Sequence, residues 1–260
     1  MRDLQLRQVV TVAGVALVAC RARAPQQAEA PTHHAAHFTY AGANGPEHWA
    51  QLDSAWAACA TGRQQSPVDL ADATRRHDAP IEFHYRPSAL RLVNNGHTVQ
   101  DDYDPGSYIL VGGARFDVVQ FHFHAPGEHH VTGQAFPAEL HVVHRSAAGG
   151  LAVIGVLLEA GAANRAYQVI LDSLPGEEGP ERTMGAMLNV ADLLPVTHGT
   201  YRYAGSLTTP PCSEGVQWLV MDTPVTLSAA QLGSLTRVIH DNNRPIQPLN
   251  GRPLVEVSER

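Results

Sequence analysis

Two short segments, Gln120-Phe-His-Phe-His124 and Glu139-Leu-His-Val-Val-His144, carry histidines at the spacing of β-strands. Side chains along a strand alternate between its two faces, so His122 and His124 share one face and the phenylalanines take the other. A run of Ala, Pro and Gly after His124 ends the first strand. We therefore predict that two neighbouring strands of a sheet bring His122, His124 and His141 to one point.

Three imidazoles around one point, with a fourth position left open, are the donor set of catalytic zinc sites. A single strand histidine is usually an ordinary polar residue, but a pair two residues apart with a third one hairpin away favours metal binding. Gln120 and Glu139 each precede a histidine by two residues and share its face, where an oxygen could hold the second ring nitrogen. They could also be ordinary polar strand residues. We predict Zn²⁺ as the cofactor, with His122, His124 and His141 as its ligands.

The composition is that of a globular protein. The chain has 260 residues, of which 44% are hydrophobic and 17% charged, and its formal net charge is −7. A negative net charge without a run of Lys and Arg argues against nucleic acid as a partner. The length beyond the N-terminal segment is sufficient for one large domain with its own core.

The first 20 residues are typical of an export signal. Arg2 and Arg7 flank its start, and an apolar run from Val9 to Ala19 is long enough for a signal peptide but too short to span a bilayer. The run ends in Leu-Val-Ala-Cys20, which resembles a bacterial lipoprotein processing site with a lipidated cysteine. An ordinary secretory signal with an incidental Cys20 is the alternative.

Residues 21–36 are rich in Ala, Pro and Gln and predict a disordered tether, which leaves residues 37–260 as the folded domain. We expect an exported protein of the periplasm or cell envelope that contacts a membrane only through its lipid. Beyond Cys20, only Cys59 and Cys212 remain, and an even pair in an oxidising compartment suggests one disulfide. Two free buried thiols are the alternative.

Most of the remaining chain predicts strands. Short β-rich runs separated by Gly, Pro and Asn occur at Tyr108–Val111, Phe116–Phe121, Leu151–Leu158 and Val216–Val220. Two segments predict helices, residues 164–173 and residues 228–240, the second with Ser228 as its N-cap. The expected fold class is mainly β (α+β), with a large, mostly antiparallel twisted central sheet and a few peripheral helices.

The order of the sequence motifs resembles that of the α-class carbonic anhydrases, bacterial exported type, over residues 37–252. These motifs are Tyr40, Asn44-Gly-Pro-Glu-His-Trp49, Gln65-Ser-Pro67, Asn94-Asn-Gly-His97, Gln120-Phe-His-Phe-His124, Glu128-His129, Glu139-Leu-His-Val-Val-His144, Tyr203, Ser206-Leu-Thr-Thr-Pro-Pro-Cys212 and Asn242-Asn-Arg-Pro245. Two departures are small: Phe38 stands where the family commonly has Trp, and Gly127 where it commonly has Ser.

The resemblance implies zinc-dependent reversible hydration of CO₂ to bicarbonate and a proton. His122, His124 and His141 would hold the zinc, and a hydroxide on the metal would attack the carbon of CO₂. Thr208 would orient that hydroxide by donating its own proton to Glu128, and Thr209 would help to place the substrate. An apolar wall for the linear substrate would comprise Val143, Val153, Leu207, Val216 and Trp218.

The resemblance also implies a route for the proton. His97 matches the position of the family's proton shuttle, and Tyr40, Asn95 and Gln100 would order the connecting waters. Gln120, Glu139 and Asn242 would surround the ligands. Without the resemblance, His97 is simply a loop histidine after a turn glycine.

Two other functions fit parts of the sequence. The first is a cupin-type metal enzyme with Glu128 as a fourth ligand, but Ala135 stands where a cupin would have Gly. The second is an inactive member of the same fold that serves as a surface binding module. Such relatives lose a zinc histidine, whereas this chain keeps all three together with Thr208 and Glu128. The oligomeric state cannot be derived from the sequence.

Overall fold

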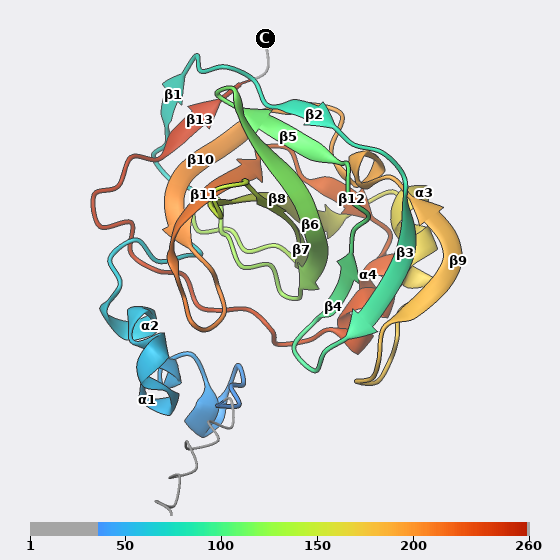
Figure 1. Ribbon diagram of the computed structural model, residues 1–260, viewed down its shortest axis with the longest axis horizontal. Helices are drawn as coiled ribbons and strands as arrows, with labels where there is room; N and C mark the ends of the chain where they lie inside the picture. Colours follow the sequence, from blue (N-terminus) through green and yellow to red (C-terminus); the bar gives the residue numbers. More distant parts are fainter. Residues whose placement is uncertain (1–35, 259–260) are drawn as a thin grey trace, which may run out of the picture. The chain divides into compact units, whose positions relative to one another are not determined.

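The computed structural model describes residues 36–258 (Figure 1). The predicted signal peptide, the lipidation site at Cys20 and residues 21–35 of the predicted tether lie outside the described residues. No helix within residues 36–258 has both the length and the apolar character needed to cross a membrane.

One large sheet of 13 strands forms the body of the domain. Its strands are β1 (Thr74–Arg76), β2 (Glu82–His84), β3 (Ser88–Asn94), β4 (Val99–Asp102), β5 (Tyr108–Val111), β6 (Ala114–His124), β7 (Ala138–Arg145), β8 (Leu151–Ala160), β9 (Arg182–Leu188), β10 (Thr200–Ser206), β11 (Glu214–Met221), β12 (Val225–Leu227) and β13 (Val255–Val257). The main path runs β1-β13-β10-β11-β8-β7-β6-β4-β3-β9, with β2, β5 and β12 paired beside it.

Most neighbouring strands are antiparallel, which confirms the predicted class of sheet. The parallel pairings are β1 with β13, and β8 with both β11 and β12. The sheet is therefore mixed around β8. Its central strands β8, β7 and β6 are long and consecutive in the chain, and Figure 1 shows them curving together through the middle of the domain.

Helices are few and short. They are α1 (Trp49–Leu52), α2 (Ala58–Thr61), α3 (Arg165–Leu171) and α4 (Ala229–Val238), with 3₁₀ turns at Gly42–Asn44, Ser54–Trp56 and Val190–Leu193. Both predicted helices form. Asn164 caps α3 by accepting from the backbone of its first turn, and Ser228 forms a capping box with Gln231 at α4. The sequence analysis did not predict α1 and α2, because four residues are too few to show a helical period.

The core explains why β6 presents its histidines in one direction. Phe121 and Phe123 on the other face of β6 are 0% and 1% exposed and pack in the larger of the hydrophobic clusters, which also contains residues of α3 and α4. Burial of each phenylalanine contributes about 2 kcal/mol relative to an exposed side chain. A slip of one residue would expose both rings and bury the histidines in their place, so the core sets the register of the histidine face.

Candidate metal centre

The three predicted ligands lie on adjacent antiparallel strands. His122 of β6 is directly opposite His141 of β7, and His124 is opposite Glu139. The ring centroids of His122, His124 and His141 are 4.6 to 5.2 Å apart, and one nitrogen from each lies within 4.8 Å of the others. The parity of the two strands thus brings the three imidazoles together.

A fixed oxygen accepts from one nitrogen of each ring. The pairs are His122 Nδ1 with Gln120 Oε1 (2.8 Å), His124 Nδ1 with Asn242 O (2.7 Å) and His141 Nε2 with Glu139 Oε1 (2.9 Å). An oxygen acceptor fixes the proton on the nitrogen it contacts, so the opposite nitrogen carries a lone pair. The lone pairs are therefore on Nε2 of His122, Nε2 of His124 and Nδ1 of His141, the atoms that converge.

Burial keeps these rings neutral. Burial lowers the pKa of His122 well below the usual histidine value and that of His124 to about 4. It also lowers the pKa of His141. His124 Nε2 is also a buried atom without a hydrogen-bond partner among the described residues. Neutral imidazoles with free lone pairs are what a metal ion requires, and three nitrogens with an open position fit Zn²⁺. The donor set therefore fits the cofactor predicted from sequence.

Glu139 forms hydrogen bonds to other groups besides His141, the partner that strand parity predicted. Its Oε1 contacts both His141 and His129 Nδ1 (2.7 Å), and its Oε2 accepts from the backbone N–H groups of Glu128 and His129 (2.8 Å each). Burial alone would raise the pKa of Glu139, but His129 and His141 outweigh it and hold that pKa well below its usual range. Glu139 is thus an ionised, fully bonded carboxylate.

His129 was missed as a site residue by the sequence analysis. Its Nε2 contacts the hydroxyl of Tyr203 (2.7 Å), which in turn donates to Ser66 Oγ (2.9 Å). This buried chain continues from Glu139 and fixes its orientation. The motif Glu128-His129 was visible in the sequence, but nothing in its spacing indicated that it contacts Tyr203.

Glu128 lies beside the ligands but is not one of the converging group. Its Oε2 is 3.6 Å from His124 Nε2 and 4.0 Å from His141 Nδ1, and its Oε1 accepts from the backbone N–H of Arg244 (2.8 Å). Burial raises the pKa of Glu128 to about 7, against the lowering effects of His141, Arg244 and the Thr208 hydroxyl. A divalent cation bound nearby would favour the ionised carboxylate.

Arg244 is a second residue without a predicted role. Its buried guanidinium donates to Gln65 Oε1 and to the backbone oxygens of Ser66 and Cys59 at 2.8 to 3.0 Å. The backbone N–H of Arg244 donates to Glu128, so these side-chain bonds connect the segment beside Glu128 to the N-terminal part of the domain. The motif Asn242-Asn-Arg-Pro245 contained this residue, but only the fold shows its contacts.

Asn242 contacts His124 through its main chain. Its backbone oxygen, not its amide, accepts from His124. The side chain binds backbone atoms instead, donating to the carbonyl oxygens of His97 and Phe123 and accepting from Ala125 N–H at 2.8 to 3.0 Å. Asn242 therefore joins the loop of His97 to the end of β6.

A cavity of about 300 Å³ adjoins the histidines. It is lined by four of the five predicted wall residues, Val143, Val153, Leu207 and Trp218, together with Thr208, Thr209, His122 and His141. Val216 is the exception: it packs in the smaller core cluster with Val153 and Trp218 and does not line the cavity. Strand parity could not detect this difference, because Val216 and Trp218 share a face of β11. Gln120, Val119, Arg145 and Leu151 complete the lining, and the last three were not predicted as site residues.

A second cavity, of about 240 Å³, leads from the histidines to His97. Its lining contains His122 and His124 together with the predicted proton-path residues Tyr40, Asn95, His97 and Gln100, and Gln100 is the cross-strand neighbour of His122. Asn95 also has a structural task, because its Oδ1 accepts from the backbone N–H groups of His97 and Thr98. Gln100 donates to Asp102 at 2.6 Å.

The ring of His97 stacks on Phe38, with centroids 4.0 Å apart and planes 6° apart. Partial burial lowers the pKa of His97, as does His37 with its ring 5.8 Å away, whereas Glu178 raises it. Phe38 also packs edge-on against Trp49. The phenylalanine that departs from the family's usual residue therefore still supplies an aromatic surface for His97.

The comparisons with known proteins agree with this geometry. A family model described as eukaryotic-type carbonic anhydrase matches residues 44–258. A carbonic anhydrase of Nostoc sp. is 44% identical over 85% of this chain and 86% of its own length. The α-carbonic anhydrase of Thermovibrio ammonificans, solved with the inhibitor sulfanilamide, superposes with a TM-score of 0.83 at 43% identity, over 85% of this chain and 99% of the other. The α-carbonic anhydrase of Photobacterium profundum superposes with a TM-score of 0.80 at 41% identity, over 84% of this chain and 100% of the other.

The chain belongs to the α-carbonic anhydrase family. The resemblance inferred from its motifs is confirmed, and the chain is an enzyme of the carbonic anhydrase type. The cupin alternative is wrong, because both the family and the fold are those of the carbonic anhydrases.

The predicted disulfide of this carbonic anhydrase is present. Cys59 and Cys212 form a disulfide, with their Cα atoms 5.0 Å apart and a sequence separation of 153. Cys212 also donates its backbone N–H to Thr209 O (2.9 Å), so the cross-link holds the loop of Thr208 and Thr209. A disulfide is typical of a protein that folds in an oxidising, extracytoplasmic compartment.

Proposed function

We propose that this carbonic anhydrase hydrates CO₂ reversibly to bicarbonate and a proton, with one Zn²⁺ held by His122, His124 and His141. The observation that carries the proposal is the convergence of three neutral ring nitrogens, each with its opposite nitrogen held by an oxygen. When bound, zinc supplies a water that is activated for attack at neutral pH.

Thr208 and Glu128 orient the attacking oxygen. Glu128 is buried and lacks a partner at Oε2 among the described residues, while Thr208 lies close enough to lower its pKa. A hydroxyl has one proton, so a Thr208 that donates to Glu128 can only accept from the attacking oxygen. This directs the lone pair of that oxygen into the cavity, where it can meet the substrate carbon.

The cavity wall suits a small uncharged substrate. Val143, Val153, Leu207 and Trp218 present apolar surface next to His122 and His141, and CO₂ has no charge to be desolvated. Thr209 lines both cavities, so its hydroxyl can contact substrate or the bicarbonate formed from it. Val216 acts only indirectly, by supporting the wall from the core.

Stopped-flow measurement of CO₂ hydration on protein of known metal content tests this function. We expect about one zinc per chain and a rate that disappears when a chelator removes the metal and returns with added Zn²⁺. Stoichiometric zinc without hydration above the uncatalysed rate would instead favour the inactive binding module.

His97 is proposed as the proton shuttle. Each hydration cycle releases a proton, and the apolar wall offers no base to receive it; histidine is the side chain suited to this transfer near neutral pH. His97→Ala should slow kcat several-fold or more at low buffer concentration while kcat/KM for CO₂ stays nearly unchanged, because attack precedes proton export. Stopped-flow assays over a range of buffer concentrations measure the split, and added imidazole should restore much of the lost kcat.

The matched control is His84→Ala, which removes a histidine of β2 that stacks on Tyr108 and lines neither cavity. It should leave kcat unchanged at every buffer concentration. A proportional loss of kcat/KM in His97→Ala, with no response to imidazole, would show that His97 supports the cavity and carries no proton.

We also propose that the mature protein begins at a lipidated Cys20 and is held at a membrane surface through residues 21–36. The sequence similarity to a lipoprotein processing site supports this. Cys20→Ser should move the enzyme from the membrane fraction to the soluble exported fraction with unchanged specific activity, because the segment precedes the domain. Intact-mass measurement checks it: an unlipidated N-terminus at another residue contradicts the anchor.

A further inference from the structure

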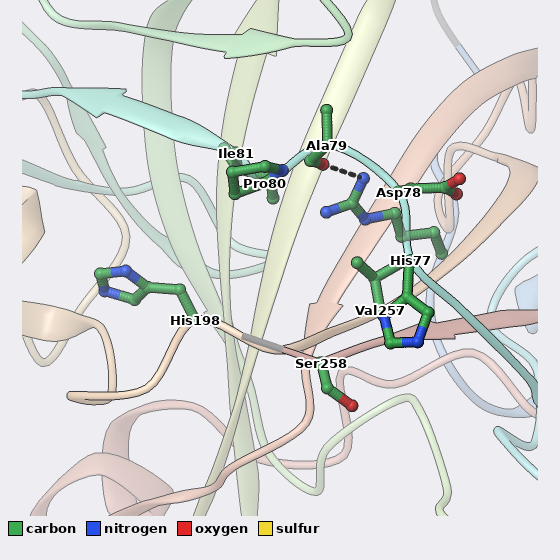
Figure 2. Close-up of a pocket in the computed structure, with 9 residues that line it drawn as sticks. His77, Asp78, Ala79, Pro80, Ile81, His198, Val257 and Ser258 are labelled. Atoms are coloured by element: carbon green, nitrogen blue, oxygen red, sulfur yellow. Dashed lines mark hydrogen bonds between the residues drawn. The ribbon is translucent and has the colours of Figure 1, made fainter. Parts of the chain in front are cut away.

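A cavity of about 510 Å³ lies apart from the metal centre and shares no lining residue with either cavity described above. It is formed by the segment between β1 and β2, residues 77–81, and by residues in or next to β10 and β13 (Figure 2). Figure 2 shows His77 and His198 at opposite sides of the opening, with Ser258 below them and Pro80 above.

Arg202 of β10 is the charged group of this cavity. Its Nε donates to Thr200 Oγ1 (2.8 Å), and its Nη1 donates to Ala79 O (3.1 Å), the bond drawn in Figure 2. Nη2 has no acceptor and Arg202 has no ion pair within the part of the chain that the structure describes. The guanidinium is thus fixed in place with one nitrogen left to bind.

The Arg202 guanidinium is partly desolvated. Burial lowers the pKa of Arg202, and the Asp78 carboxylate partly offsets this effect. Two hydrogen bonds compensate the guanidinium in part, and a carboxylate bound at Nη2 would add charge-assisted hydrogen bonds. Arg202 is therefore positioned to bind an anion at lower entropic cost than a free arginine.

The other lining residues restrict the ligand further. Pro80, Ile81 and Val257 provide apolar surface, while His77, His198 and Ser258 provide polar groups around it. Asp78 lines the same cavity and would repel a second negative charge. The volume lies within the range of sites for small organic ligands.

We propose that this cavity binds a small organic monocarboxylate, with its carboxylate on Arg202 and its apolar body against Pro80, Ile81 and Val257. The site does not depend on the hydration reaction or on zinc. Dicarboxylates and phosphate dianions are disfavoured because Asp78 lies beside the guanidinium.

Benzoate is a suitable probe, with benzamide as the neutral ligand of the same shape and succinate as the dianion. Zinc-loaded full-length enzyme with isotope-labelled histidine is titrated, and the ring NMR signals of His77 and His198 are followed after assignment with His77→Gln and His198→Gln. Benzoate bound at the metal centre would move the signals of His122 and His141 instead, so the two sites are separated. We expect saturable shifts of His77 and His198 with benzoate, and binding at least tenfold weaker with benzamide and with succinate.

Two substitutions should act in opposite directions. Arg202→Gln should weaken benzoate binding at least tenfold, whereas Asp78→Asn should strengthen it a few-fold by removing the like charge. Arg237→Gln at an exposed position of α4 makes the same charge change elsewhere and should have no effect. If Arg202→Gln does not fold, Arg202→Lys keeps the charge but loses the planar fork and should still bind more weakly. Unmoved His77 and His198 signals, equal binding of benzamide, or a loss of affinity in Asp78→Asn would overturn the proposal.

Discussion

Replacing His141 by alanine should remove most of the bound zinc and essentially all CO₂ hydration. His141 supplies one of three converging nitrogens, and two remaining imidazoles cannot complete the donor set of a catalytic zinc site. The substitution also leaves Glu139 with one partner fewer in a buried environment, so the site loses an orienting contact as well as a ligand. Metal analysis by mass spectrometry and stopped-flow hydration on the same sample measure both losses.

The matched control lies on the same strand. His144 of β7 faces the other way and is paired with the Tyr85 hydroxyl at 2.8 Å. His144→Ala should lower the free energy of unfolding, because it leaves a buried hydroxyl unpaired, yet zinc should remain near one per chain. Near-native zinc and activity in His141→Ala would contradict the ligand assignment.

Replacing Cys59 and Cys212 together by serine is expected to cost up to about 5 kcal/mol in the free energy of unfolding, from the chain entropy of a loop of this length. The cross-link spans 153 residues, so the unfolded chain gains much freedom when it is lost. The backbone N–H of Cys212 donates a hydrogen bond to Thr209 O. Loss of the disulfide should therefore loosen the loop of Thr208 and lower kcat too. Denaturant unfolding followed by fluorescence gives the first quantity, and stopped-flow hydration gives the second.

Cys20→Ser is the control for this double substitution, because it removes a cysteine outside the folded domain. It should leave the unfolding midpoint of the domain unchanged. Alkylation of the native, non-reduced enzyme should modify neither Cys59 nor Cys212. An unchanged midpoint in the double variant would mean that the stability of the domain comes from its core alone.

The sequence alone determined the cluster of three histidines, because the information that places them is local. A period of two places His122 and His124 on one face and Phe121 and Phe123 on the other, and burial of those rings sets the register. The same parity placed Gln120 and Glu139 beside their histidines. The single disulfide followed from counting, because only Cys59 and Cys212 remain after Cys20.

The tertiary structure decided the contacts between segments far apart in the chain. The Asn242 carbonyl holds His124 across 118 residues, and Arg244 reaches Gln65 across 179, and no periodicity encodes either pairing. Val216 and Trp218 share a face of β11, but only Trp218 lines the cavity and Val216 is covered by core side chains. Which residues of a face reach a cavity depends on how the neighbouring strands pack over it. Arg202 had no distinctive sequence pattern at all: its guanidinium, which forms no ion pair among residues 36–258, faces a cavity only once β10, β13 and residues 77–81 come together. Local periodicity specifies the face of a strand on which a side chain lies, whereas only the tertiary packing specifies which residues that side chain contacts.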